Sequence, residues 1–508
     1  MIKSIQRVPY LLWGIAALNV FLHLAFYQNL EYHRDELLYF SQGLHPDWGY
    51  ASVPPLTGWL AGLVGATLGF SVWAVKVLPA LFSGVMVLLV VAISRELGGR
   101  DYAQILAGIG VVLTPLAMRA FFMFQPVYLD IFFWTLLFYW LVLFLNTSSQ
   151  QYLYALGITL GLALLNKYLV ALWALSALAA LLLTDDRKVF TRKAVYVAFG
   201  ISLLIFSPNI IWQIQHDFPV LQHMVALNES QLVHVDRDQF LADQLLMGYS
   251  VLLLLVPGLY FLLRHRKYRS VALIVLFTVG LLCLVRGKSY YTAGVFPVLL
   301  AAGAVFWGNI LVKTFGKILL PVSMFLLVVP LLPLGLPIYD VKGLAAYFDK
   351  LDKNYGVDVG RRFEDGTVHS LPQDYADMLG WEELTRLVQR AYQQTGDKTN
   401  VLIYCENYGH AGAISIIGKK YLLPEPMCFS ESFLYWAPGL LNHEVREFIY
   451  VNDELGEDLQ RGFAEIREIG RIQNVNAREF GTRVYLCRQP RVDVQAFLKA
   501  RIAEETPF

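Results

Sequence analysis

The chain has 508 residues, of which 56% are hydrophobic and only 16% are charged. Soluble enzymes carry about a quarter of charged residues, so this composition excludes an ordinary soluble protein and indicates one that resides in a bilayer. The formal net charge of +1, with no concentrated basic surface, excludes a nucleic-acid partner.

Apolar runs follow one another through the first two thirds of the chain, and about 20 apolar residues cross a hydrocarbon core. We predict about eleven transmembrane helices, two of them joined by a tight turn at Asn166-Lys167-Tyr168. The first run has no clear small-x-small cleavage site and is interpreted as a retained span rather than a signal peptide. The eleven runs are Pro9 to Tyr27, Val72 to Ile93, Ala103 to Met118, Val127 to Leu145, Leu153 to Leu165, Leu169 to Leu183, Ala194 to Trp212, Leu245 to Leu263, Val271 to Val285, Thr292 to Leu311 and Ile318 to Leu336.

The basic residues of the short loops predict the orientation, because such loops stay in the cytoplasm. With a cytoplasmic N-terminus, an eleven-span path places every basic loop inside. This holds only if Pro54 to Phe70 lies along the outer interface instead of spanning. The chain is therefore expected in a bacterial inner membrane. The basic residues concerned are Arg95, Arg100, Arg187, Lys188, Arg192, Lys193, Arg264, Arg266, Lys267, Arg269, Lys313 and Lys317.

Charges become frequent after about Pro337, where a proline-rich segment is expected to end the last span. Three short runs there, Val401 to Tyr404, Glu447 to Val451 and Thr482 to Leu486, are typical of strands, and Trp381 to Tyr392 is typical of a helix. We therefore predict a transmembrane domain over residues 1–336 and an extracytoplasmic α/β domain over residues 337–508.

Several charged residues share the outer membrane face in this topology, although they come from loops far apart in sequence. Ionisable groups near the hydrocarbon boundary are costly unless they pair or act. Asp35-Glu36 is the leading candidate, because a carboxylate at the mouth of a helical bundle can accept a proton from an acceptor hydroxyl. The competing interpretation is an ordinary solvated pair of loop acids.

The segments around these charges resemble bacterial membrane glycosyltransferases of the GT-C class, of the protein mannosyltransferase and aminoarabinose transferase type. Each motif is short, and the resemblance depends on their order and spacing over most of the chain. The matching stretches are His33 to Tyr39, Trp48-Gly49-Tyr50, Val53 to Leu56, Arg95 to Gly99, Asn166-Lys167-Tyr168, Pro208 to Gln213, Lys288 to Gly294, Pro297 to Gly303 and Glu406 to Ala413.

The resemblance implies a GT-C fold and an inverting transfer of a sugar from a polyprenyl-phosphate donor, whose tail lies in the bilayer, to an acceptor at the outer face. By matching position, Asp35 would be the general base that activates the acceptor. Glu36 would be a supporting acid that orients the acceptor or balances nearby cations.

Lys288 has an independent physical argument, because departure of the lipid phosphate develops negative charge that a lysine at the membrane rim can stabilise. Arg286 could share this task, Tyr291 could donate a hydrogen bond, and Lys167 is a second phosphate candidate. The alternative is that these cations only anchor helix ends by snorkelling.

His33, Asp130 and His216 are further candidates, although Asp130 also fits a buried helix-end contact and His216 a loop hydrogen bond. His216, Glu229 and His234 lack a compact metal-binding spacing, so a divalent metal stays open and no cofactor is assigned. The cysteines, at 283, 405, 428 and 487, show no C-x-x-C spacing, and a disulfide among them also stays open.

Two other functions fit the same spans. A transporter or flippase of a glycolipid or polar solute also has many helices and intramembrane charges, but carriers usually show paired repeats and charges at the bilayer midplane. The second of these alternatives is a non-catalytic subunit of an envelope-polysaccharide machine. The sequence identifies neither the sugar nor the acceptor, which could be a lipid, a glycan or a protein.

Overall fold

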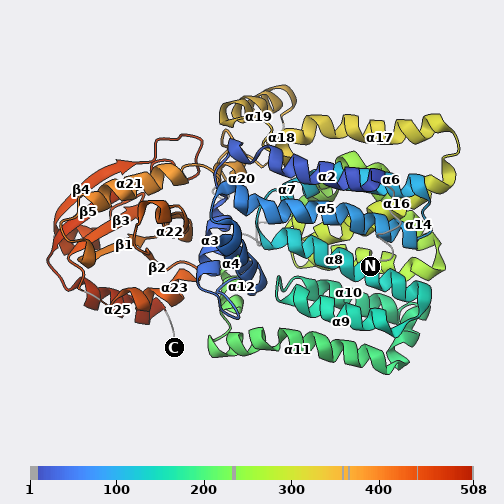
Figure 1. Cartoon of the computed structure of the whole chain (residues 1–508), viewed down its shortest axis with the longest axis horizontal. Coiled ribbons are helices and arrows are strands. Elements are labelled where there is room, and N and C mark those ends of the chain that lie inside the picture. The colour runs from blue at the N-terminus through green and yellow to red at the C-terminus, as the bar shows by residue number, and fades with distance from the viewer. Residues whose placement is uncertain are drawn as a thin grey trace.

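A computed structural model describes residues 10–230, 236–356, 358, 360–363, 366–442 and 444–505. Its larger part is a bundle of roughly parallel and antiparallel long helices, and a smaller part with a sheet adjoins one end of the bundle (Figure 1). His234 lies outside the described residues. The bundle helices are α2 (Tyr10–Ala25), α5 (Val72–Glu96), α6 (Asp101–Val112), α8 (Pro126–Thr147), α9 (Gln150–Leu164), α10 (Val170–Leu182), α11 (Lys193–Gln215), α13 (Arg237–Met247), α14 (Leu252–Arg264), α15 (Arg269–Leu284), α16 (Phe296–Ile310) and α17 (Thr314–Val328).

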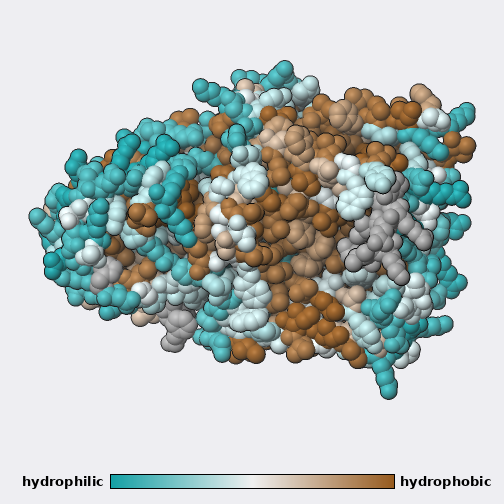
Figure 2. Space-filling view, in the orientation of Figure 1, coloured by the Kyte–Doolittle hydropathy of each residue, from teal (hydrophilic) through white to brown (hydrophobic). Residues whose placement is uncertain are grey.

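Within the described chain, seven helical segments are long and apolar enough to cross a bilayer, and α13 with α14, bent by 62°, would add an eighth. Helices α6 and α10 are apolar but shorter. Outward-facing apolar side chains such as Leu204 on α11 and Leu326 on α17 stay exposed. Figure 2 shows the resulting apolar surface across the visible face of the bundle, with more hydrophilic side chains toward both ends. The chain is therefore a multi-pass helical membrane protein.

Small residues allow the bundle helices to approach closely. A Cβ added at Gly303 on α16 would lie 2.0 Å from the carbonyl oxygen of Leu254 on α14, and one at Gly258 would lie 2.1 Å from that of Leu299. Such crossings are typical of membrane helices, because backbone approach replaces the hydrophobic driving force that lipid removes.

Two further helices, α3 (Arg34–Leu44) and α4 (Leu56–Leu68), pack against each other and run across the end of the bundle (Figure 1). Helix α4 covers most of the Pro54 to Phe70 stretch that was expected at the outer interface. Its course across the bundle end agrees with that expectation.

The basic loops gather at the opposite end. Arg266 pairs with Asp185 at 2.7 Å, Arg192 donates to the carbonyl of Ser148, and the Tyr102 hydroxyl donates to that of Lys317. The sequence predicts the basic loops on one membrane face and the candidate site residues on the other. In the structure, these two groups lie at opposite ends of the bundle.

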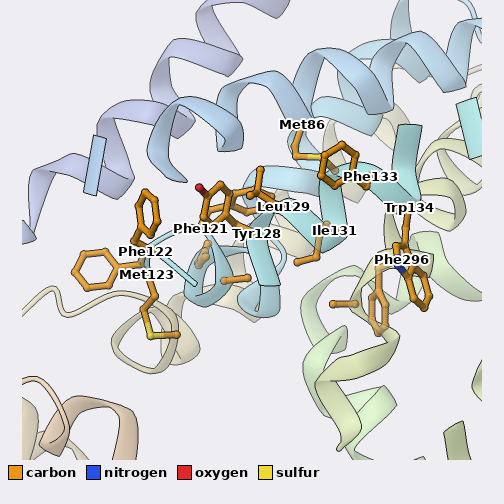
Figure 3. Packing of buried hydrophobic residues seen from close by; sticks show 14 of the residues in the cluster. Met86, Phe121, Phe122, Met123, Tyr128, Leu129, Ile131, Phe133, Trp134 and Phe296 are labelled. Carbon is orange, nitrogen blue, oxygen red and sulfur yellow. The ribbon is translucent and has the colours of Figure 1, made fainter. Parts of the chain in front are cut away.

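The core is densest around α8 and the segment that precedes it. Figure 3 shows Phe121, Phe122 and Met123 ahead of Tyr128, and Phe296 beside Trp134. Trp134 also contacts Gly294, where an added Cβ would lie 2.6 Å from its ring. This packing holds the 3₁₀ segment η6 (Ser289–Val295), with Tyr290 and Tyr291, against α8.

The smaller part contains a five-stranded mixed sheet in the order β2-β1-β3-β5-β4. Strand β1 pairs in parallel with β2 and β3, and β5 pairs antiparallel with β3 and β4. The predicted strands and the predicted helix are confirmed by β1, β3, β5 and α21. The elements are α19 (Val341–Tyr355), α20 (Gln373–Ala376), α21 (Trp381–Gln393), β1 (Val401–Cys405), α22 (Tyr408–Ile416), β2 (Met427–Cys428), α23 (Phe433–Trp436), β3 (Glu447–Asn452), α24 (Glu457–Gly462), β4 (Phe463–Arg471), β5 (Arg483–Pro490) and α25 (Val494–Glu505).

Candidate active site

Asp35 lies in the first turn of α3, at the junction of the bundle and the sheet region. His33 caps this helix: its Nδ1 accepts the backbone N–H of Asp35 at 3.1 Å, and its own N–H donates to the Glu36 side chain at 2.8 Å. This capping box fixes the direction in which the two acids point. The Asp35 side chain is 32% exposed, so its carboxylate stays accessible to a substrate.

Two donors from distant segments orient the Asp35 carboxylate. The Tyr408 hydroxyl donates to Oδ1 at 2.9 Å, and Gln125 Nε2 donates to Oδ2 at 3.1 Å. Each carboxylate oxygen has room for a second hydrogen bond, so a base held in this way can still receive a proton.

Glu36 has the opposite environment, because its side chain is fully buried. Lys76 of α5 donates to its Oε1 at 2.6 Å, and the backbone N–H of Phe124 donates to the same oxygen at 2.8 Å. With the N–H of His33 on Oε2, three donors occupy the carboxylate. These contacts support the balancing of a cation that was expected for Glu36, and they tie α3 to α5.

Tyr408 reaches Asp35 because of how α22 begins and packs. The Asn407 side chain accepts the N–H of His410, which caps the helix and makes Tyr408 its first residue. Gly412 permits close approach to α3, since an added Cβ would lie 2.8 Å from the Cβ of Leu37. Arg34 covers the Tyr408 ring at 4.3 Å.

Lys167 stands in the turn between α9 and α10, and its neighbours hold that turn in place. Asn166 accepts from Thr57 at 3.0 Å and donates to the carbonyl of Pro126 at 3.0 Å, and the Tyr168 hydroxyl donates to Asn209 at 2.9 Å. The Lys167 ammonium lies 4.6 Å from the centre of the Tyr291 ring.

The second candidate cation, Lys288, lies near Lys167. Burial lowers the pKa of Lys167; Asp130 opposes that shift, and Lys288 adds to it. Burial and Lys288 also lower the pKa of His223 on α12 (Pro219–Ser230). The Lys288 carbonyl accepts the N–H of Tyr291 at 3.0 Å, but among the described residues the Lys288 ammonium has no hydrogen-bond or ion-pair partner, so its charge is available to an anion.

Tyr39 of α3 is within electrostatic reach of both Asp35 and Tyr291, the tyrosine that Lys167 contacts. Burial raises its pKa, and Asp35, Tyr408, Glu431 and Tyr291 raise it further. Asp35, Tyr408 and Tyr291 are therefore within electrostatic reach of Tyr39, and Lys167 contacts the Tyr291 ring. We call these five residues the cluster.

A second charged pair borders this cluster. Arg119 contacts Asp374 at 3.0 Å and covers the Tyr375 ring at 3.9 Å. Burial raises the pKa of Asp374, but Arg119 and His33 outweigh burial and leave that pKa below its usual value. The His33 Nε2 is buried and has no hydrogen-bond partner among the described residues.

Three predicted residues lie apart from these contacts or in different surroundings. His216 stacks on Trp212 at 4.0 Å and meets Tyr435 edge-on at 5.5 Å, and its Nδ1 is 2.9 Å from the carbonyl oxygen of its own helix. Arg286 is exposed at the end of α15 in left-handed backbone. Asp130 is buried in α8 near Lys167.

In the ranges that the structure describes, no group of three or more His, Cys, Asp or Glu side chains could hold a metal ion. Metal dependence therefore stays as open as the sequence left it.

Glu431 and His223 join the cluster without any signal in the sequence. Ser52 donates to Glu431 Oε2 at 2.8 Å, and His223 Nδ1 lies 3.8 Å from Glu431 Oε1. Burial raises the pKa of Glu431 to about 7, with a further contribution from Asp35. Tyr408 was part of a recognised motif, but only the fold gives it a partner.

Comparison with known proteins places this arrangement in context. The family model described as dolichyl-phosphate-mannose-protein mannosyltransferase matches residues 52–212. A lipid A galacturonosyltransferase, RgtD of Rhizobium johnstonii, is 24% identical over 213 residues, or 42% of this chain. That match spans 43% of the relative's own length. Asp35, Tyr408 and Glu431 all lie outside the segment that the family model covers.

Solved structures match almost the whole chain. ArnT from Cupriavidus metallidurans bound to undecaprenyl phosphate superposes with a TM-score of 0.65 at 14% identity, over 94% of this chain and 97% of that one. The oligosaccharyltransferase AglB from Archaeoglobus fulgidus, in complex with an inhibitory peptide and a dolichol-phosphate, gives a TM-score of 0.50 at 12% identity, over 87% and 69% of the two chains. The shared feature is the fold.

Proposed function

We propose that this chain, which has the GT-C glycosyltransferase fold, transfers a sugar from a polyprenyl-phosphate carrier to an envelope acceptor. The observation that carries the proposal is the Asp35 carboxylate, which is accessible and held by Tyr408 and Gln125. Tyr290, which is within electrostatic reach of Asp35, has its ring centre 5.4 Å from the Lys167 ammonium. A general base for the acceptor and cations for the departing phosphate are what an inverting displacement at an anomeric carbon requires.

In the proposed reaction, Asp35 takes the proton from an acceptor hydroxyl as its oxygen bonds to the anomeric carbon. The bond from that carbon to the phosphate oxygen breaks, and its electron pair leaves with the lipid phosphate. Lys288 and Lys167 stabilise the charge that develops there. Tyr291, whose ring centre is 4.6 Å from the Lys167 ammonium, is a candidate to assist, and so is Arg286, two residues before Lys288 in the chain. Glu36 keeps α3, and with it Asp35, in position through Lys76.

The proposed topology has eleven crossings, a cytoplasmic N-terminus and residues 337–508 on the periplasmic face of a bacterial inner membrane. The helices α6, α9 and α10 count as crossings in this path, although each is shorter than the hydrocarbon core demands of an untilted helix. A carrier tail in the bilayer and a phosphosugar at the outer end of the bundle fit the position of the cluster.

A lipid-anchored acceptor is the first to examine, because the curated relative acts on lipid A. The sugar is best found with a panel of undecaprenyl-phosphate donors that includes a hexose, a hexuronic acid and an aminopentose.

The test uses the purified full chain in lipid nanodiscs, with that donor panel and lipid A as the acceptor probe. Asp35→Asn should reduce transfer at least about 100-fold, because general-base catalysis is lost while binding remains. Transfer by Asp35→Asn at the wild-type rate would refute the role of Asp35 as the base. If undecaprenyl phosphate does not bind the wild-type protein, the donor class is wrong.

Lys288→Ala should instead weaken undecaprenyl phosphate binding about 10-fold, because one charge-assisted contact is removed. Lys313→Ala, at the opposite end of the bundle, is the matched control and should bind as the wild type does. Equal binding by both variants would show that Lys288 only anchors its helix end.

A further inference from the structure

Glu431 is held more firmly than an ordinary loop acid. The segment that carries it is tied to α3 and to the loop that follows α3. Ser432 Oγ accepts from Gln42 Nε2 of α3 at 3.3 Å and from the N–H of Ala51 in that loop at 3.2 Å. The Glu431 carboxyl group itself accepts from Ser52 and is only 16% exposed. The tether fixes the carboxyl group against the bundle end.

Its backbone is strained. Glu431 has a φ of 57°, in the left-handed region where a side chain with a Cβ is disfavoured and glycine is not. A strained residue persists when the surroundings over-determine it, and such residues gather at functional sites. A glycine would fit this turn with less strain.

The tether brings Glu431 to the helix that carries Asp35, because Gln42 lies seven residues after Asp35 on the same face of α3. Asp35 is within electrostatic reach of Glu431. The ionisable groups that face it come from every neighbouring element. They are Arg34, Asp35 and Tyr39 of α3, His223 of α12, Tyr408 of α22, Tyr435 of α23, and Cys428 of β2. Two acids from different parts of the fold thus share one site, one of them accessible and the other largely buried.

We propose that Glu431 is the second carboxyl group of the acceptor site, where it donates a hydrogen bond to the acceptor while Asp35 removes the reacting proton. This inference rests on the proposed function. Glu431 neither gains nor loses a proton in the step, since the proton moves from the acceptor hydroxyl to Asp35. Neighbouring carboxyl groups can divide such roles when their environments differ.

The first test separates the side chain from its strained backbone with Glu431→Gly and Leu422→Gly. Leu422 has a φ of 56° and is 85% exposed, so it provides a matched site of equal strain away from the cluster. Both variants should melt at or above the wild-type temperature. Glu431→Gly should lose about 100-fold in transfer, as expected when a positioning contact is removed, with undecaprenyl phosphate binding unchanged. Leu422→Gly should transfer at the wild-type rate.

The second test uses Glu431→Gln, which keeps a donor but cannot ionise. The wild-type rate should fall as the pH rises through about 7, where the buried acid loses its proton. Glu431→Gln should retain at least about a tenth of the wild-type rate and should not show this decline. An unchanged alkaline decline, or wild-type transfer by Glu431→Gly, would overturn the assignment.

Failure of the proposed function is distinguishable, because it would appear in the wild-type protein as absent donor binding or transfer. A defect confined to the Glu431 variants leaves the donor chemistry intact.

Discussion

Adjacent carboxyl groups in one helical turn have different uses here. Asp35 faces the cluster with two donors and an accessible surface, whereas Glu36 is enclosed by three donors. Along an α-helix, successive residues point about 100° apart, so a single turn can serve both the site and the core. Asp35 is therefore exposed to the site, whereas its neighbour Glu36 anchors the helix.

Loss of the Glu36 charge should mainly lower the stability of the folded protein, and should affect sugar transfer only as a consequence. Glu36→Gln leaves Lys76 as a buried cation without its counterion, which costs about 3 to 5 kcal/mol. Thermal unfolding in detergent measures this. The double variant Glu36→Met with Lys76→Met should recover most of the loss, and a double variant as unstable as Glu36→Gln would contradict the ion-pair explanation.

Glu431 should also make stability depend on pH. Its pKa is raised from 4.5 to about 7 by burial, so the folded state holds a proton that the unfolded state releases above pH 4.5. The stabilisation is complete below about pH 4.5 and is lost as the pH rises through about 7, with a total of up to about 3 kcal/mol. The difference in melting temperature between wild type and Glu431→Gln, measured across this range, should follow that direction. An opposite slope would mean that Glu431 is charged in the folded protein.

At the scale of elements, the contact of α22 with α3 positions the site. Their close approach depends on Gly412, and the cap by Asn407 places Tyr408 at the helix start. The turn between α9 and α10 works in the same way for Lys167, through Asn166 and its partners. In both cases short polar or small residues at element ends aim a long side chain into the cluster.

Gly412→Ala should therefore weaken both packing and activity. Its Cβ would collide with the backbone of Leu37, forcing α22 away from α3 at a cost of about 1 to 3 kcal/mol and moving Tyr408 from Asp35. Transfer rate and melting temperature should fall together. Gly439→Ala, where an added Cβ meets nothing within 4 Å, is the control and should change neither. An active, stable Gly412→Ala would show that this approach tolerates a methyl group.

Hydropathy predicted the elements better than the site. The apolar runs and the strand patterns of the smaller part correspond to helices and strands because burial and side-chain period are local signals. Asp35 could be predicted from the sequence motif around it. Glu431 was not, because its role arises from Ser52, His223 and a left-handed backbone that no spacing encodes. Lys76 was hidden in an apolar run, and only the fold shows that it balances Glu36.

At the scale of the whole molecule, the two ends of the bundle differ in chemistry. One end carries the basic loops, and the other carries the cluster of acids, tyrosines and cations beside the sheet region (Figure 1). A membrane enzyme with a lipid-linked substrate benefits from this polarity, because orientation during insertion also decides on which face the reaction occurs.

Cysteine labelling tests this orientation. In a Cys283→Ser background, the exposed Thr191 of a basic loop and the exposed Glu454, which follows β3, are each replaced by cysteine. A membrane-impermeant maleimide applied to intact spheroplasts should label Glu454→Cys and not Thr191→Cys until the membrane is permeabilised. The reverse pattern would invert the proposed topology and move the cluster to the cytoplasmic face.

The bond between Tyr408 and Asp35 joins residues 373 positions apart in the chain. At ribosomal rates of about 5 to 20 residues per second, Asp35 therefore emerges roughly 20 to 75 seconds before its partner. A nascent or prematurely terminated chain would hold an inserted bundle but an incomplete reaction centre. The Asp35 carboxylate therefore gains the Tyr408 hydroxyl only after almost the whole chain has been made.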